Sequence, residues 1–212
     1  MNHLEYINYL KEELKKNFYS RTSFEKADER YYHSLGVAKM AKTLALIYRP
    51  NDDEFSNKCE IAGILHDYGK FFRREEYEDL TKEYNVKFNY DDASRNVYHG
   101  YYGYLAIKRD LNINDEEILL AVRNHIMGAK EMSLIEEIIY VSDFIEEGRS
   151  EKEIPILIPL RDLALNGKLK EAVALESKFV IKYLISKNAV INPISLECYN
   201  GYNKYLKDDK GE

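Results

Sequence analysis

Apolar side chains recur every three or four residues along most of this chain, and that spacing places them on one face of an α-helix. Residues 58–66 form a nearly continuous apolar run, which fits either a buried strand or a buried helix. Its Ala, Leu and Glu content and its lack of alternation favour the helix. No convincing set of alternating strands is present, so the sequence predicts an all-α fold. Residues 4–16 and 31–48 each show one apolar stripe, and the first consists of Leu4, Ile7, Leu10 and Leu14.

Helix-capping residues mark several of the expected boundaries. Asn114 precedes three acidic residues and is expected to be the N-cap of one helix. Ser133 and Glu136 have the spacing of a capping box, in which each side chain satisfies a backbone amide of the other residue. Asn192 is followed by a proline, which is typical of the first turn of a helix. Together with the apolar stripes, these signals predict roughly eight to ten helices.

The length of 212 residues suits one large domain. We expect a single domain over residues 1–212, with its core at about 18–150 and C-terminal helices at 155–207 packed on that core. Residues 70–97 and 148–160 are expected to be the less regular stretches of this arrangement.

Charge and cysteine content exclude several classes of protein. Lys and Arg number 31 against 37 Asp and Glu, for a net charge of −6, and no large basic block is present. Such a chain is a poor candidate for nonspecific binding to nucleic acid. The two cysteines are too few for a disulfide framework. The charged N-terminal segment is no secretory signal, and no stretch approaches the ~18 apolar residues of a membrane span. We expect a cytoplasmic protein that binds neither nucleic acid nor membrane.

Histidine is scarce, with five residues, and four of them project from apolar helix faces or ends, as do two aspartates. Each of these residues taken singly also fits a hydrogen-bonded core histidine or a helix-terminal aspartate. Six of them together favour a metal site, because imidazole and carboxylate are ligands that manganese, iron, cobalt and zinc accept. Helical bundles build such sites from inward-facing side chains on separate helices. The candidate ligands are His33, His66, Asp67, His99, His125 and Asp143.

The order of these residues resembles a known signature. His33, the pair His66-Asp67 and then Asp143 resemble the H…HD…D pattern of the HD-domain metal-dependent phosphohydrolases. Five longer stretches look like the successive motifs of the YqeK-like family of symmetrical diadenosine tetraphosphate hydrolases, and the resemblance covers roughly residues 4–190. These stretches are RYYHSLGVAKMA (30–41), AGILHDYGK (62–70), YHGYYGYLA (98–106), AVRNHIMGA (121–129) and IIYVSDFIEEGR (138–149).

The resemblance implies a single helical HD-type hydrolase domain with two divalent ions per chain. Iron is the ion that the resemblance favours, and manganese, cobalt or zinc suit the same ligands. The residues that match the first metal site are His33, His66, Asp67 and Asp143. The residues that complete the second site are His99 and His125, with Asp67 as the bridging ligand.

The resemblance also implies the reaction, which is symmetrical cleavage of diadenosine tetraphosphate to two ADP by a metal-bound hydroxide. Asp67 would orient that hydroxide, while Lys70 and Arg149 would contact phosphate oxygens, Lys70 with a catalytic role as well. Glu146 is expected to orient a neighbouring side chain. Lys70 also fits a solvated basic turn, and Arg149 a charge at a helix C-terminus. The partner is then a small dinucleoside polyphosphate or nucleotide, and a homodimer is compatible with a chain of this size.

Departures from the family pattern leave other functions open. Ile126 and Met127 stand where the family usually has Thr and a variable residue, and Glu147 replaces its usual proline. A nucleoside monophosphatase or a guanosine tetraphosphate hydrolase would keep the H…HD…D core. Those enzymes usually need one metal, so His99 and His125 count against them. A cyclic-dinucleotide phosphodiesterase would carry a Gly-Tyr-Pro element after the His-Asp pair, and none follows here. The non-enzymatic alternative is a regulatory module stabilised by a metal.

Overall fold

The structure is a computed structural model, and it describes residues 2–88, 95–152 and 154–206. Within them the chain forms ten α-helices and two short 3-10 helices, with no strand, as the all-α prediction requires. The α-helices are α1 (His3–Tyr19), α2 (Phe24–Tyr48), α3 (Asp53–Leu65), α4 (Arg74–Glu83), α5 (Tyr98–Leu111), α6 (Glu116–Asn124), α7 (Leu134–Ile145), α8 (Leu157–Leu165), α9 (Leu169–Ser186) and α10 (Pro193–Tyr202). The 3-10 helices are η1 (Arg95–Val97) and η2 (Asn203–Tyr205).

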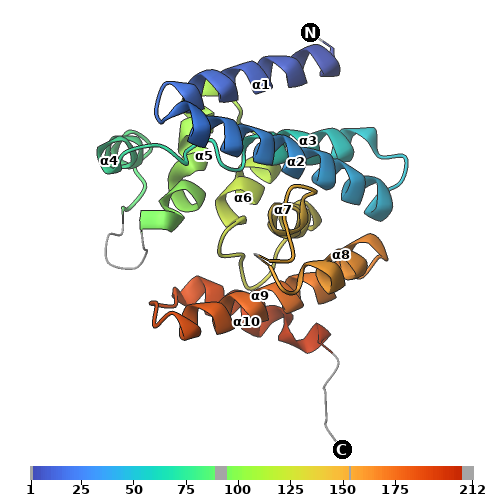
Figure 1. The fold of residues 1–212 in the computed structure, drawn as a ribbon. Coiled ribbons are helices and arrows are strands. Elements are labelled where there is room, and N and C mark those ends of the chain that lie inside the picture. Colours follow the sequence, from blue (N-terminus) through green and yellow to red (C-terminus); the bar gives the residue numbers. More distant parts are fainter. Residues whose placement is uncertain (1, 89–94, 153, 207–212) are drawn as a thin grey trace, which may run out of the picture.

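The helices form layers around α3, α6 and α7. In Figure 1, α1 to α3 lie at the top, α6 and α7 occupy the middle, and α8 to α10 lie at the bottom. Helix α7 contacts α2, α3 and α6 on one side and α8 and α9 on the other. The C-terminal helices therefore pack directly beneath the central layer. The division into a core at about 18–150 and packed helices at 155–207 stays a prediction.

Two of the expected caps are confirmed by hydrogen bonds. The Glu136 carboxylate accepts a hydrogen bond from the Ser133 amide at 2.8 Å, and the Asn192 side chain accepts one from the Ile194 amide at 2.9 Å. The apolar stripe of α1 is buried as predicted except at its first member, since Leu4 is 68% exposed. These features were predictable because each depends on residues within one or two helical turns.

One cap was assigned to the wrong residue. The N-cap of α6 is Asp115, whose carboxylate accepts hydrogen bonds from the amides of Glu117 at 3.0 Å and Ile118 at 3.3 Å. The side chain of Asn114 turns back instead and donates to the carbonyl of Asn112 at 3.3 Å. Both residue types are good N-caps, and the carboxylate of Asp115 satisfies two of the free amides at once.

The two stretches expected to be less regular contain more helix than predicted. Helix α4 lies within residues 70–97, and α8 begins within 148–160. Helix α4 is mostly polar and buries few side chains, among them Tyr77 and Leu80, so its apolar stripe is too short to stand out in the sequence. It packs on α5, and this contact with a neighbouring helix explains why such a polar segment is helical.

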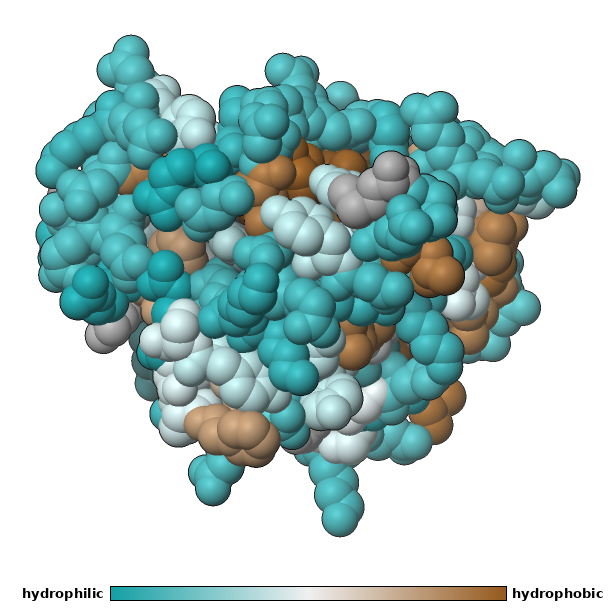
Figure 2. All heavy atoms as spheres, turned by 90° about the horizontal axis from the view of Figure 1, so that it is seen from above, coloured by the Kyte–Doolittle hydropathy of each residue, from teal (hydrophilic) through white to brown (hydrophobic). Residues whose placement is uncertain are grey.

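Hydrophilic residues cover most of the surface seen from above, and hydrophobic atoms appear there only in separate, smaller areas (Figure 2). In the part of the chain that the structure describes, no helix combines the length and the apolar character that crossing a bilayer requires. Both cysteines are buried and unpaired, in agreement with the absence of a disulfide framework.

The close approach of α2 and α3 depends on a glycine. A Cβ atom at Gly63 would lie 2.6 Å from the Cα of Ala38 and 2.9 Å from its backbone nitrogen. Real carbon contacts are not that short, so any larger residue at Gly63 would push the two helices apart. This spacing matters for function because α2 and α3 carry His33 and His66.

We expect Gly63→Ala to lower the free energy of unfolding by roughly 1–3 kcal/mol, the usual cost of overpacking a core. Urea unfolding followed by circular dichroism measures the change. Gly103→Ala is the matched control, because Gly103 is also helical and its new Cβ would meet only Gly69 at 3.6 Å, an ordinary contact. The free energy of unfolding should rise in Gly103→Ala, because alanine has a higher helix propensity than glycine. Equal behaviour of the two variants would contradict the packing argument.

Candidate metal centre

Five separate parts of the fold bring the six predicted ligands together. His33 lies inside α2, His66 is the C-cap of α3 and Asp67 follows it directly. His99 lies in the first turn of α5, His125 ends α6, and Asp143 lies in the last turn of α7. Three groups of their ligand atoms each lie within 4.8 Å of one another. These groups are His33 with His66 and Asp67; His66 with His125 and Asp143; and Asp67 with His99 and His125.

Asp67 lies between the two ends of this cluster. Its Oδ1 atom is 2.8 Å from His99 Nε2 and 3.8 Å from His125 Nε2, while its Oδ2 atom is 3.5 Å from His66 Nε2. Asp143 lies at the other end of the cluster, where its Oδ1 atom is 2.9 Å from His33 Nε2. The side chain of Asp67 is 2% exposed, and a carboxylate buried to that extent requires a cation or strong hydrogen bonds.

The histidine rings are oriented by their other nitrogen. The Nδ1 atoms of His66 and His125 lie 2.8 Å and 2.6 Å from a carbonyl oxygen three residues earlier in the chain. The Nδ1 atom of His33 lies 3.2 Å from a carboxylate oxygen of Glu146, which is the orienting role expected for that residue. Because carbonyl and ionised carboxylate oxygens only accept hydrogen bonds, Nδ1 is the donor in all three rings.

This arrangement leaves three Nε2 lone pairs directed into the cluster. The Nε2 atoms of His33, His66 and His125 are buried and, as acceptors, meet no hydrogen-bond donor among the described residues; the group nearest His33 Nε2 is the carboxylate of Asp143, which cannot donate. Buried polar atoms without partners are rare in folded proteins and need an explanation. Histidines that bind metals donate their second ring nitrogen to a carbonyl or carboxylate in the same way. The donor set therefore fits a divalent metal.

Burial and neighbouring groups set the protonation of the ligands. Burial lowers the pKa of His66, and it lowers that of His99 to about 4. Burial alone would raise the pKa of Asp67, but the nearby His66 and Lys70 outweigh it and hold the pKa well below its usual range. The pKa of Asp143 is also lowered, because the nearby His33, His66 and His125 outweigh its burial. The pKa of His33 is raised instead, because the carboxylates of Asp143 and Glu146 outweigh its burial. Metal binds the neutral imidazole and the ionised carboxylate, so a metal would compete with a proton at His33.

The two cations predicted at the substrate both lie against the ligands. Lys70 Nζ is 3.1 Å from His99 Nε2 and 3.8 Å from Asp67 Oδ1, with 30% of its side chain exposed. Arg149 donates from Nη2 to Asp143 Oδ1 at 3.0 Å, and its side chain is also 30% exposed. Both cations therefore contact the centre and solvent at the same time, so neither is only a solvated surface charge.

Arg30 is a residue of the site that the sequence reasoning missed. It donates from Nη1 to Asp67 Oδ2 at 2.9 Å, across 37 residues of sequence. The available signal was its position three residues before His33, which places both side chains on one face of a helix. The cluster thus has a guanidinium or ammonium group against each of its two carboxylates.

We expect Arg30→Ala to destabilise the metal-free protein by roughly 1.5–3 kcal/mol, the usual worth of a hydrogen bond to a charged group. The buried Asp67 carboxylate loses its nearest guanidinium in this variant. The loss should be smaller when a divalent metal is added, because the metal neutralises the same carboxylate. Urea unfolding with and without EDTA measures both values.

The matched control for this prediction is Lys39→Ala on the same helix. Lys39 pairs with Glu147 at 2.8 Å, and both side chains are about two-thirds exposed (66% and 67%). Exposed pairs contribute about 0–1 kcal/mol, so this variant should change little with or without EDTA. An Arg30→Ala variant that is no less stable than the control would contradict the pairing described for Asp67.

Comparison with known proteins reveals clear relatives. The HD domain family matches residues 30–154, a region that contains all six converging residues. A Staphylococcus aureus protein named symmetrical bis(5'-nucleosyl)-tetraphosphatase is 35% identical over 192 residues, covering 86% of this chain and 92% of that protein. A Bacillus subtilis protein of the same name is 31% identical over 173 residues, covering 82% and 89%. A crystal structure from Clostridium acetobutylicum, of a predicted HD superfamily hydrolase involved in NAD metabolism, has a TM-score of 0.77 at 30% identity. It covers 92% of this chain and 97% of that one.

Proposed function

The chain belongs to the HD domain family, and we propose that it is a metal-dependent hydrolase that cleaves diadenosine tetraphosphate symmetrically to two ADP. The observation that carries the proposal is the set of three buried Nε2 atoms that meet no hydrogen-bond donor among the described residues and lie beside the carboxylates of Asp67 and Asp143. Relatives named for the symmetrical reaction match most of this chain and most of their own length, which supports the same substrate here.

We propose two divalent ions per chain, with iron favoured and manganese, cobalt or zinc as alternatives. One ion would be held by His33, His66, Asp67 and Asp143, and the other by Asp67, His99 and His125. Support comes from the overlap of the three ligand groups, two of which contain Asp67. A divalent ion in such a site neutralises phosphate charge and lowers the pKa of a bound water toward neutrality.

The protein's own side chains would then bind and orient the reacting groups. Asp67 is ionised and offers both oxygens, so it can accept a hydrogen bond from the attacking water and hold that water in position. Lys70 and Arg149 would contact phosphate oxygens, where negative charge grows as the phosphorus–oxygen bond breaks. Arg30 would contact phosphate oxygens as well, because its guanidinium lies against Asp67 and 23% of its side chain is exposed to solvent.

The experiment that tests this function combines metal analysis with product analysis. The protein is purified without chelator, its metals are quantified per chain, and it is incubated with diadenosine tetraphosphate while products are separated by chromatography. About two metals per chain and ADP as the sole product are expected. AMP and ATP as products would overturn the symmetrical cleavage.

Other outcomes of that assay would support the competing functions. Two metals with no turnover, even after addition of iron, manganese or cobalt, would favour another HD phosphohydrolase activity. Nucleoside monophosphates and guanosine tetraphosphate are the next substrates in that case. Absence of both metal and turnover would favour a regulatory module. The homodimer and the cytoplasmic location stay predictions. Sedimentation velocity tests the first, and cell fractionation tests the second.

A further inference from the structure

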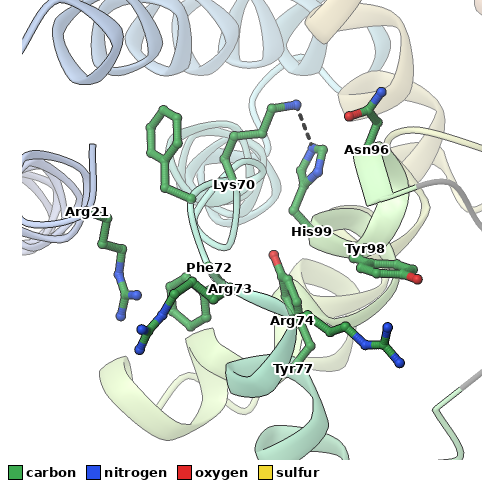
Figure 3. A pocket seen from close by; sticks show the side chains of 10 residues that line it. Arg21, Lys70, Phe72, Arg73, Arg74, Tyr77, Asn96, Tyr98 and His99 are labelled. Carbon is green, nitrogen blue, oxygen red and sulfur yellow. Dashed lines mark hydrogen bonds between the residues drawn. The ribbon is translucent and has the colours of Figure 1, made fainter. Parts of the chain in front are cut away.

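A basic cavity opens beside the metal ligands, on the side of His99 (Figure 3). Its volume is about 320 Å³. Lys70 and His99 belong both to its wall and to the cluster around Asp67, and the hydrogen bond between these two residues is visible in Figure 3. A molecule in the cavity would therefore extend to the ligands themselves.

Positive charge dominates the wall of this basic cavity. Arg21, Lys70, Arg73 and Arg74 line it, and no acidic residue does among those that the structure describes. Three carboxylates lie behind these cations: Glu76 is 2.6 Å from Arg21 and 3.5 Å from Arg73, Glu78 is 3.0 Å from Arg74, and Asp67 is 3.8 Å from Lys70. Three carboxylates against four cations leave an excess of positive charge, and it is the cations that face the cavity. Such a wall suits a ligand with several negative charges.

Arg21 is held in place before any ligand arrives. Its guanidinium lies over the ring of Phe72, 3.9 Å from the ring centroid, and it donates to Asn17 as well as to Glu76. A cation fixed by stacking and hydrogen bonds loses little conformational entropy when it binds a phosphate. Arg73 contributes a different kind of cation, since its side chain is 77% exposed and free to reach toward a ligand.

A second cavity, of about 460 Å³, touches the cluster at another ligand, His33. Its wall combines Arg30 and Arg149 with Glu29, Glu146 and Glu147, so both acidic and basic groups line it. The two cavities thus meet the ligand cluster at two different histidines, which come from α5 and α2. The two cavities differ in the charge of their walls. Of the two, the basic cavity is lined by cations without carboxylates.

We propose that the basic cavity is the subsite for one nucleoside diphosphate half of the substrate, with Arg21 and Arg73 contacting its phosphate oxygens. The inference rests on the proposed function, because central cleavage of a tetraphosphate leaves two phosphates and a nucleoside on each side of the reacting bond. Each half then needs its own space beside the ligands.

The test compares wild type with Arg73→Glu. The variant reverses one exposed charge and keeps the backbone hydrogen bond from residue 73 to Glu76, measured at 2.9 Å. Residue 73 is the N-cap of α4, and a negative charge at a helix N-terminus interacts favourably with the helix dipole, so α4 should remain folded. We expect KM for diadenosine tetraphosphate to rise at least about tenfold, with a much smaller change in kcat, because the lost contact serves binding. Arg21→Met should have an effect in the same direction.

Lys82→Glu is the matched control for Arg73→Glu. Lys82 lies in the last turn of the same helix, its side chain is 74% exposed, and it is outside the lining of the basic cavity. The charge change is identical, so KM should stay within about twofold of wild type. An equal rise in KM in both variants would show general electrostatic attraction and overturn the subsite.

Titration of the wild type and Arg73→Glu with ADP separates this inference from the proposed function. Weaker ADP binding in Arg73→Glu supports the subsite, even if the wild type fails to cleave diadenosine tetraphosphate and the proposed function falls. Cleavage by the wild type with unchanged KM and unchanged ADP affinity in Arg73→Glu and Arg21→Met would overturn the subsite and leave the function standing.

Discussion

Asp67→Ala is expected to lower kcat/KM for diadenosine tetraphosphate by at least about a thousandfold, equivalent to roughly 4 kcal/mol of transition-state stabilisation. Asp67 belongs to two of the three ligand groups, and its two oxygens face different histidines. Its removal would therefore weaken both proposed metal positions at once. Chromatography of the products measures activity, and metal analysis of the purified variant measures the expected loss of bound ions.

The control for Asp67→Ala is Asp79→Ala in α4, whose side chain is 76% exposed. It should retain activity and metal content. Circular dichroism of Asp67→Ala decides between two interpretations of a loss. Loss of hydrolysis with the fold retained supports the enzyme. Loss of folding, together with a wild type that shows no hydrolysis, would support a structural metal instead.

Gly128→Ala is expected to lower the free energy of unfolding by roughly 2–5 kcal/mol. Gly128 has a φ of 65°, in the left-handed region, where an L-residue with a Cβ costs about 1–2 kcal/mol. A Cβ would also collide with the sulfur of Cys198 on α10, and overpacking adds about 1–3 kcal/mol. The turn follows His125 by three residues, so metal content should fall as well. Urea unfolding and metal analysis measure the two effects.

Gly167→Ala separates the two costs of Gly128→Ala. Gly167 has a φ of 77°, but a Cβ there would have no atom within 4 Å. This control should lose only the backbone contribution of about 1–2 kcal/mol. If both variants lost the same free energy, the packing of α10 against the turn after His125 would contribute nothing, and the steric argument would be wrong.

The residues of the metal centre were predicted from helix faces and from the resemblance, and the structure brings all six together. Their partners were harder to foresee. The contact of Arg30 with Asp67 spans 37 residues, and that of His33 with Glu146 spans 113. No local pattern encodes such distances, because they depend on how helices pack. Only the structure showed that Glu76 is shared by two arginines at the wall of the basic cavity.

The sequence by itself determined the features that arise between near neighbours in the chain. The capping box at Ser133 and the apolar face of α1 follow from side chains one or two turns apart, whose spacing a helix fixes. Tertiary structure decided what lies between helices. The absence of a Cβ at Gly63 sets the approach of α2 to α3, and the stacking of Arg21 on Phe72 helps shape the basic cavity. Such contacts join residues far apart in sequence, so they exist only once the core has packed.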